Sequence, residues 1–337
     1  GTRVLLTIEA ATVTLILVVS VVVLVKLVNG TAPGGHGLDW SVFTVAPGTD
    51  VSAVFLGVVF GFLSFAGFEA AATLGEETRS PRRSIPRAIL GTAIFGGVYF
   101  VFVTAVEVMG FGADAGGVEA FTRSASLLGD LGGAYVAAWI GDLITVGAAV
   151  SAFGCALACA VSAARLVFAL SRDGLLPSGL AAVSGTRGTP VRSTLLVVAG
   201  MYVIVALARF AFAAAPMDLF VASGTIGTLI LLVGYALATL GAAKLLFFGP
   251  DARSARATSG DGRRVAIWEV VIPVLALVLI GYTLFRNVIP YPEGGAGIYP
   301  AVSAGWIVLG VLLVLVRRRA AAAAGERLTA NEGLART

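Results

Sequence analysis

The chain has 337 residues, of which 58% are hydrophobic and only 12% are charged. Its mean hydropathy of +0.96 excludes a soluble globular domain and predicts an integral membrane protein. The net charge of +4 and the pI of about 9.3 come without any basic patch interleaved with aromatic residues, so we expect no nucleic-acid partner.

Eight apolar stretches are long enough to cross a bilayer, which takes about 20 helical residues. We therefore predict an all-α fold with one transmembrane domain over residues 1–318. A short tail, 319–337, begins as a helix-prone segment and ends as a disordered one. The predicted helices cover residues 5–28, 51–75, 88–110, 133–168, 193–213, 218–248, 267–286 and 300–316.

Arginines distinguish the two ends of these helices. They are frequent at the start of the chain, in alternate loops and after residue 316, whereas the opposite loops hold only Lys26, Arg123, Arg209 and Arg286. Cytoplasmic loops carry the excess of basic residues. We expect a multi-pass protein of the cell membrane whose two ends both lie in the cytoplasm, with the basic loops against anionic lipid.

The segment 60–87, FGFLSFAGFEAAATLGEETRSPRRSIPR, is the most informative part of the chain. Gly61, Gly67 and Glu69 fall where a continuous span would have aliphatic residues. A carboxylate at bilayer depth costs about 2.5–3.5 kcal/mol on insertion scales. Lipid cannot satisfy the backbone groups of an interrupted helix, so such a helix must line a cavity or be buried in protein. Transporters build binding sites in this way, and the segment predicts a carrier.

The sequence lacks the residues that other functional classes require. The only histidine, His36, falls in a Gly/Pro-rich loop over residues 29–50, where we interpret it as a solvated residue. Paired intramembrane aspartates, an HExxH motif and a phosphate-binding loop are absent from the sequence. We therefore expect neither an enzyme nor a pump with its own motor, and no metal or cofactor.

Two longer motifs resemble one transporter family. FAGFEAAATLGEETRSPRRSIPRAI (65–89) is similar to the sixth helix and following loop of amino acid–polyamine–organocation permeases, with Ser80-Pro81 in place of the usual Asn-Pro. AARLVFALSRDGLLP (163–177) resembles the end of the family's eighth helix, and Thr189-Pro190 matches its next loop. The resemblance covers essentially the whole chain.

This resemblance implies a fold and a starting point. Family members usually have twelve helices in a five-plus-five inverted repeat, the leucine-transporter-like fold. If 65–89 is the sixth helix, the chain begins near the fifth and lacks the first four. Part of the expected binding site, which lies between the first and sixth helices, would then be absent.

The interruption is the predicted substrate site. Its carbonyl groups are expected to accept hydrogen bonds from a substrate ammonium, and its aromatic side chains to wall the substrate. The alternative is that these residues are core apolar residues beside a glycine kink. The candidate substrate-binding residues are Phe62, Leu63, Ser64, Phe65, Ala66 and Gly67.

Acidic residues follow the interruption. The family often has a carboxylate at the position of Glu69, and a buried carboxylate is biased towards protonation, so we expect Glu69 to couple proton release to closing of the inner pathway. A structural Glu bonded to backbone is the alternative. Glu76 and Glu77 lie beside Arg79, where a gating ion-pair network and solvated interface charges are equally compatible with the sequence.

Three hydroxyl residues complete the candidates. Ser151 lies midway along the fourth apolar stretch, where sodium-coupled relatives of the wider fold place ion ligands; a serine bonding back to its own helix is the alternative. Ser223 and Thr225 are expected to border the outer vestibule.

Together these features predict a secondary active transporter for amino acids or related organic cations. It would be proton-coupled or would exchange one substrate for another. A sodium-coupled symporter and a non-transporting sensor or interaction protein on the same fold remain alternatives. The sequence leaves the oligomeric state open.

Overall fold

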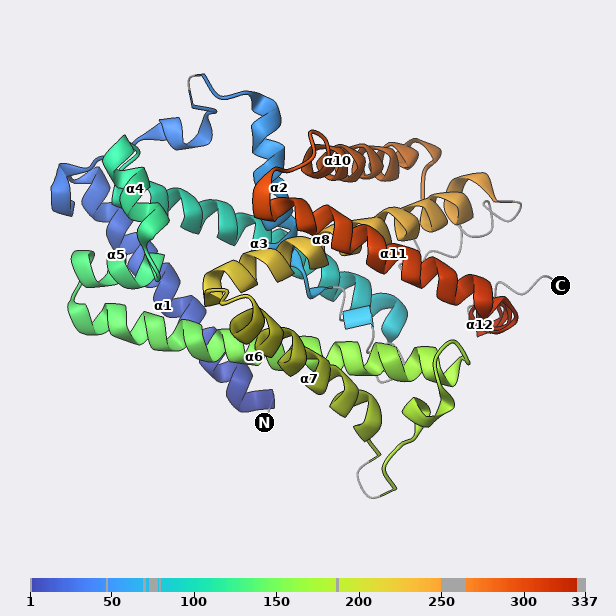
Figure 1. Ribbon diagram of the computed structural model, residues 1–337. Coiled ribbons are helices and arrows are strands. Elements are labelled where there is room, and N and C mark those ends of the chain that lie inside the picture. The colour runs from blue at the N-terminus through green and yellow to red at the C-terminus, as the bar shows by residue number, and fades with distance from the viewer. Residues whose placement is uncertain are drawn as a thin grey trace. The chain divides into compact units, whose positions relative to one another are not determined.

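The computed structural model describes residues 2–46, 48–68, 71–72, 78, 80–185, 188–249 and 265–331. Every regular element in these ranges is a helix (Figure 1). The long helices are α1 (Thr2–Val28), α2 (Val51–Phe65), α3 (Pro81–Phe111), α6 (Ala138–Arg172), α7 (Val191–Ala206), α8 (Pro216–Ala243), α10 (Val271–Val288), α11 (Ile298–Val316) and α12 (Arg318–Asn331). Shorter elements are α4 (Ala115–Arg123), α5 (Leu127–Tyr135), η1 (Pro33–Gly35), η2 (Trp40–Phe43), η4 (Ser178–Ala181), η5 (Leu207–Ala211), η6 (Lys244–Phe248), η7 (Ile267–Val270) and η8 (Gly294–Gly297).

Within the described ranges, seven helices are long and apolar enough to cross a membrane, one fewer than predicted. The difference is the second stretch, predicted over 51–75, because α2 ends at Phe65. A helix of 15 residues rises about 22 Å, less than the roughly 30 Å of a hydrocarbon core. The seven segments are Leu6–Val28, Arg83–Phe111, Ala138–Arg172, Val191–Ala211, Pro216–Phe248, Ile267–Val288 and Gly294–Val316.

The fourth predicted stretch, 133–168, starts too early. Its first residues belong to α5, and α6 begins only at Ala138 and continues to Arg172. The carbonyl of Gly132 accepts hydrogen bonds from the N–H groups of both Val136 and Ala137, at 3.0 and 3.1 Å, which closes α5 and reorients the chain. The stretch is apolar throughout, so its hydropathy gave no sign of this division.

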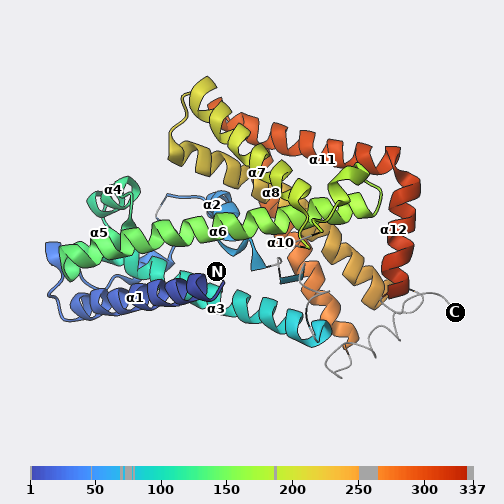
Figure 2. The same cartoon turned by 90° about the horizontal axis from the view of Figure 1, so that it is seen from below.

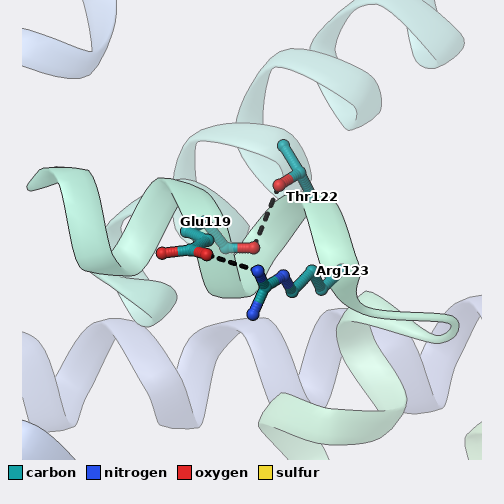
Figure 3. A network of polar contacts seen from close by, with 3 residues as sticks. All are labelled: Glu119, Thr122 and Arg123. Carbon is teal, nitrogen blue, oxygen red and sulfur yellow. Dashed lines mark hydrogen bonds and ion pairs between the residues drawn. The ribbon is translucent and has the colours of Figure 1, made fainter.

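The preceding segment, 111–132, contains α4 and the start of α5. Asp114 caps α4 by accepting a hydrogen bond from the N–H of Gly117 at 2.8 Å. On the surface of α4, Arg123 pairs with Glu119 at 2.6 Å, and the Thr122 hydroxyl donates to the Glu119 carbonyl (Figure 3). Both charged side chains are largely exposed, so this ion pair contributes little to stability.

The chain divides into two compact units. The first comprises Gly1–Asp50 and Leu90–Cys159, and the second comprises Val51–Ile89 and Ala160–Thr337. In the second unit, α12 turns sharply away from the line of α11 (Figure 2), so the predicted helix-prone tail is a separate helix up to Asn331.

The core of the first unit joins α1, α3, α5 and α6. On α1, Val19, Val23 and Leu27 recur every four residues and form one buried face. The partners of this face include Val106 on α3 and Leu131 on α5. The apolar periodicity of α1 therefore reflects packing inside this unit.

Polar contacts join the ends of the same helices. The ammonium of Lys26 donates to the carbonyl of Tyr135 at 2.6 Å, and the Tyr135 hydroxyl donates to the carbonyl of Gly110 at 2.8 Å. Burial raises the pKa of Tyr135. His36 is half-buried and packs beside Gly112, which has a φ of +104°; a Cβ at position 112 would lie 2.7 Å from its ring. His36 therefore lies in the predicted loop with part of its ring covered by Gly112.

In the second unit α8 is the central helix, in contact with α2, α10 and α11. Its buried face carries Thr225, Thr228, Leu229 and Leu232. On α11 the Ser303 hydroxyl donates to the α8 carbonyl of Ile226 at 3.3 Å and to its own helix. Within this unit α2 packs against α8 and α10.

Candidate functional site

The candidate site lies where α2 stops. The helix ends at Phe65, the N–H of Ala66 bonds the carbonyl of Leu63 at 3.0 Å, and Gly67 follows with a φ of +114°. A positive φ is readily available only to glycine and is the usual way to leave a helix. The interruption inferred from Gly67 is therefore present in the structure.

The six residues of the predicted substrate segment are not equally covered. Phe62, Leu63, Phe65 and Ala66 are half-buried, whereas Ser64 and Gly67 are exposed. The Ser64 hydroxyl donates to the carbonyl of Phe60 in the preceding turn at 2.9 Å. The carbonyl of Leu63 already accepts the N–H of Ala66, and the C-terminal end of α2 carries the negative end of its helix dipole.

The end of α2 contacts α8 close to the predicted vestibule residues Ser223 and Thr225. Leu63 packs on α8 at Gly224, where an added Cβ would lie 2.6 Å from Leu63 Cδ2. The Ser223 hydroxyl bonds its own helix at the carbonyl of Leu219, 2.6 Å away, and Thr225 is buried. Thus Gly224, between the two predicted residues, makes the contact with α2.

A second contact follows the interruption. The ring of Phe68 stacks on that of Tyr235 of α8, with centroids 6.1 Å apart. The two sides of the interruption therefore lie against one helix of the same unit.

The first turns of α2 are held by α10. Arg286 Nε donates to the carbonyl of Ser52 at 3.4 Å, and Asn287 Nδ2 donates to that of Phe55 at 3.3 Å. The ring of Phe55 also meets Tyr282 edge to face, with centroids 4.6 Å apart. The sequence did not predict these two hydrogen bonds between α10 and α2, because their partners lie more than 230 positions apart and no motif links them.

The predicted coupling and gating residues Glu69, Glu76 and Glu77 lie outside the described residues. Among the residues that are described, no group of three or more His, Cys, Asp and Glu side chains could hold a metal ion.

Ser151 lies in the first unit and does not belong to the α2 site as described. Its hydroxyl donates to Glu9 Oε1 of α1 at 2.6 Å, where a bond to its own helix was the simpler expectation. One turn away on each helix, Gly147 faces Thr12; a Cβ at 147 would lie 3.0 Å from Thr12 Oγ1. The α1–α6 contact is therefore close and lined with oxygen atoms.

Comparison with known proteins places the chain among transporters. The sequence profile of the family described as "Amino acid permease" matches residues 4–323. An uncharacterized transporter from Mycobacterium tuberculosis is 33% identical over 261 residues, which cover 76% of this chain and 51% of the relative.

Two relatives carry a substrate in their names. The branched-chain amino acid permease BcaP of Lactococcus lactis is 31% identical over 48% of this chain and 34% of its own length. BcaP of Bacillus subtilis is 30% identical over 42% of this chain and 29% of its own length. The chain spans about half the length of the mycobacterial relative, at 51%.

Proposed function

The chain belongs to the amino acid permease family and is a multi-pass membrane protein, and we propose that it serves as a secondary active transporter of amino acids or related amines. The single observation that carries this proposal is the end of α2 at Phe65, followed by Gly67 at a φ of +114°. A short half-helix of this kind supplies backbone acceptors to a charged solute within a membrane protein.

The chemistry of the interruption suits a zwitterion with an apolar side chain. The negative end of the α2 dipole attracts an ammonium. Phe62, Leu63 and Phe65 offer apolar surface, and an aromatic ring also favours a nearby cation. Two relatives are named as branched-chain amino acid permeases, so L-leucine is the first substrate to test.

We assign the remaining roles as part of the same proposal. Residues 1–318 form the transporter domain in the cell membrane, with the chain ends and the tail in the cytoplasm. Glu69 binds the coupling proton, while Glu76 and Glu77 gate the inner end; Ser223 and Thr225 border the outer entrance.

A sodium-coupled carrier is the second candidate, favoured by the contact of Ser151 with Glu9. A carboxylate and hydroxyl groups are the hard oxygen ligands that a small cation prefers. The two candidates differ in the gradient that drives accumulation.

The test is uptake of radiolabelled L-leucine, and then of the other standard amino acids, by the full-length protein in liposomes. Proton coupling predicts accumulation driven by a pH gradient, and sodium coupling predicts accumulation driven by a sodium gradient at constant pH. Absence of uptake and of exchange for every amino acid would support the sensor alternative.

Glu69→Gln sharpens the test. It should abolish gradient-driven accumulation while leaving substrate binding detectable, because the amide cannot carry the proton. The matched control is Glu119→Gln on the surface of α4, which should accumulate substrate normally. Normal accumulation by the Glu69 variant would remove Glu69 as the coupling group.

A further inference from the structure

One face of α8 contacts residues on both sides of Gly67. Gly224 contacts Leu63, before the interruption, and Tyr235 stacks on Phe68, after it. Because a helix has 3.6 residues per turn, positions 224, 228, 231 and 235 share one face. Thr228 therefore lies on the same face of α8, between these two contacts.

The hydroxyl of Thr228 is buried without a partner among the residues described here. The residue is 1% exposed, and its Oγ1 makes no hydrogen bond with that part of the chain. Thr283 of α10 shows the usual solution, since its equally buried hydroxyl bonds the carbonyl of Leu279 in its own helix at 2.8 Å. Buried polar groups without partners are rare in native proteins and need a specific explanation.

Resting on the proposed function, we propose that Thr228 is a further substrate-binding residue whose hydroxyl accepts a hydrogen bond from the ammonium group of an amino acid. The end of the α2 dipole attracts a cation at this place, and a hydroxyl oxygen next to it adds one acceptor. The unpartnered state of Thr228 is then the unliganded state of a binding residue. Substrate binding then supplies the hydrogen-bond partner that Thr228 Oγ1 lacks in the unliganded protein.

Thr228→Val tests this assignment, because valine keeps the shape of threonine and removes only the hydroxyl. A hydrogen bond to a charged ligand group is strong enough that its loss should raise the Kd about tenfold. The melting temperature of the unliganded protein should stay the same or rise, because the change removes a buried polar group that has no partner. Thr228→Ser, which retains the hydroxyl, should keep most of the affinity.

Thr283→Val is the matched control in the same unit. It removes an equally buried hydroxyl that already has a partner, so the melting temperature should fall while the Kd stays unchanged. The two valine variants are therefore expected to show opposite patterns in binding and stability.

The measurement is equilibrium binding of radiolabelled L-leucine, or of the standard amino acid that the wild type binds best, to the full-length protein in detergent. Equal affinity of the wild type and Thr228→Val would overturn the assignment of Thr228 and leave the transporter proposal standing. A lower melting temperature with unchanged affinity would also overturn it, since the hydroxyl would then be bonded within the protein. If the wild type binds no amino acid, the proposed function fails and this inference fails with it.

Discussion

Ser151 of α6 donates a hydrogen bond to the carboxylate of Glu9 of α1, with Oγ and Oε1 2.6 Å apart and 142 positions between them in the sequence. The contact joins a hydroxyl that was a candidate ion ligand to an acid near the start of the chain. One turn away, Gly147 of α6 packs against Thr12 of α1, so this small residue allows the two helices to approach closely.

A double-mutant cycle on this pair should show coupling. Hydrogen bonds between membrane helices average about 0.6 kcal/mol and reach about 1.7 kcal/mol, so Glu9→Ala and Ser151→Ala, each of which removes the bond, should interact within that range. Thermal unfolding of the two single variants and the double variant measures the coupling free energy. Strictly additive effects would mean that the bond does not contribute to folding.

Gly67 and Gly61 should respond in opposite ways to alanine. Among the described residues, a Cβ at either position would meet nothing within 4 Å, so the backbone conformation distinguishes the two positions. Gly67→Ala must hold a φ of +114°, which strains an L-residue by about 1–2 kcal/mol. Gly61→Ala lies inside α2 and should stabilise the helix by about 0.5–1 kcal/mol. Melting temperatures of the two variants check this, and equal shifts would contradict the strained turn.

Asn287→Leu should loosen the hold of α10 on α2. Asn287 Nδ2 donates to the carbonyls of Phe55 and Thr283, at 3.3 and 2.9 Å, and each lost bond costs about 0.5–1.5 kcal/mol. The melting temperature should fall, and exchange of the amide hydrogens of α2 should become faster. The exposed Asn29, changed to leucine, is the control and should alter neither quantity.

Tyr135→Phe should remove part of the alkaline sensitivity of the protein. Burial raises the pKa of Tyr135, so the folded state holds the phenol proton more tightly than the unfolded chain does. The resulting stability is complete below the unfolded-state pKa of about 10 and is lost as the pH rises through the higher folded-state pKa.

The measurement is the melting temperature from neutral to strongly alkaline pH. Near neutral pH, Tyr135→Phe should be less stable because the carbonyl of Gly110 loses its donor, and the gap to the wild type should narrow as the pH rises. A gap that is constant across the titration would rule out the phenol as a source of the pH dependence.

Hydropathy was sufficient to predict the long helices. The predicted 5–28 and 300–316 correspond to α1 and to α11 (Ile298–Val316) within a few residues. The end of α2 was also foreseeable, because Gly67 is a local signal that acts within its own turn. By contrast, the division between α5 and α6 depends on backbone hydrogen bonds to Gly132 inside an evenly apolar run, which composition does not record.

The sequence predicted which segment forms the site, but not which residues of other helices pack against that segment. The segment 62–67 stands out in the sequence because it interrupts an apolar run. Its neighbours do not: Thr228 is one of several hydroxyl residues on an apolar helix, and Asn287 lies at the end of another. Their importance comes from which helix faces which, and a single sequence carries no pairing information over such separations.

α10 holds the first two turns of α2 through the carbonyls of Ser52 and Phe55, whereas α8 contacts the last turn at Leu63. A slight tilt of α10 relative to α8 would therefore change the direction of α2 and shift Phe65, about 15 Å from Phe55 along the axis. If the chain serves the proposed transport function, substitutions on α10 that never touch a solute should alter selectivity, and a search for altered-specificity mutants should recover them there.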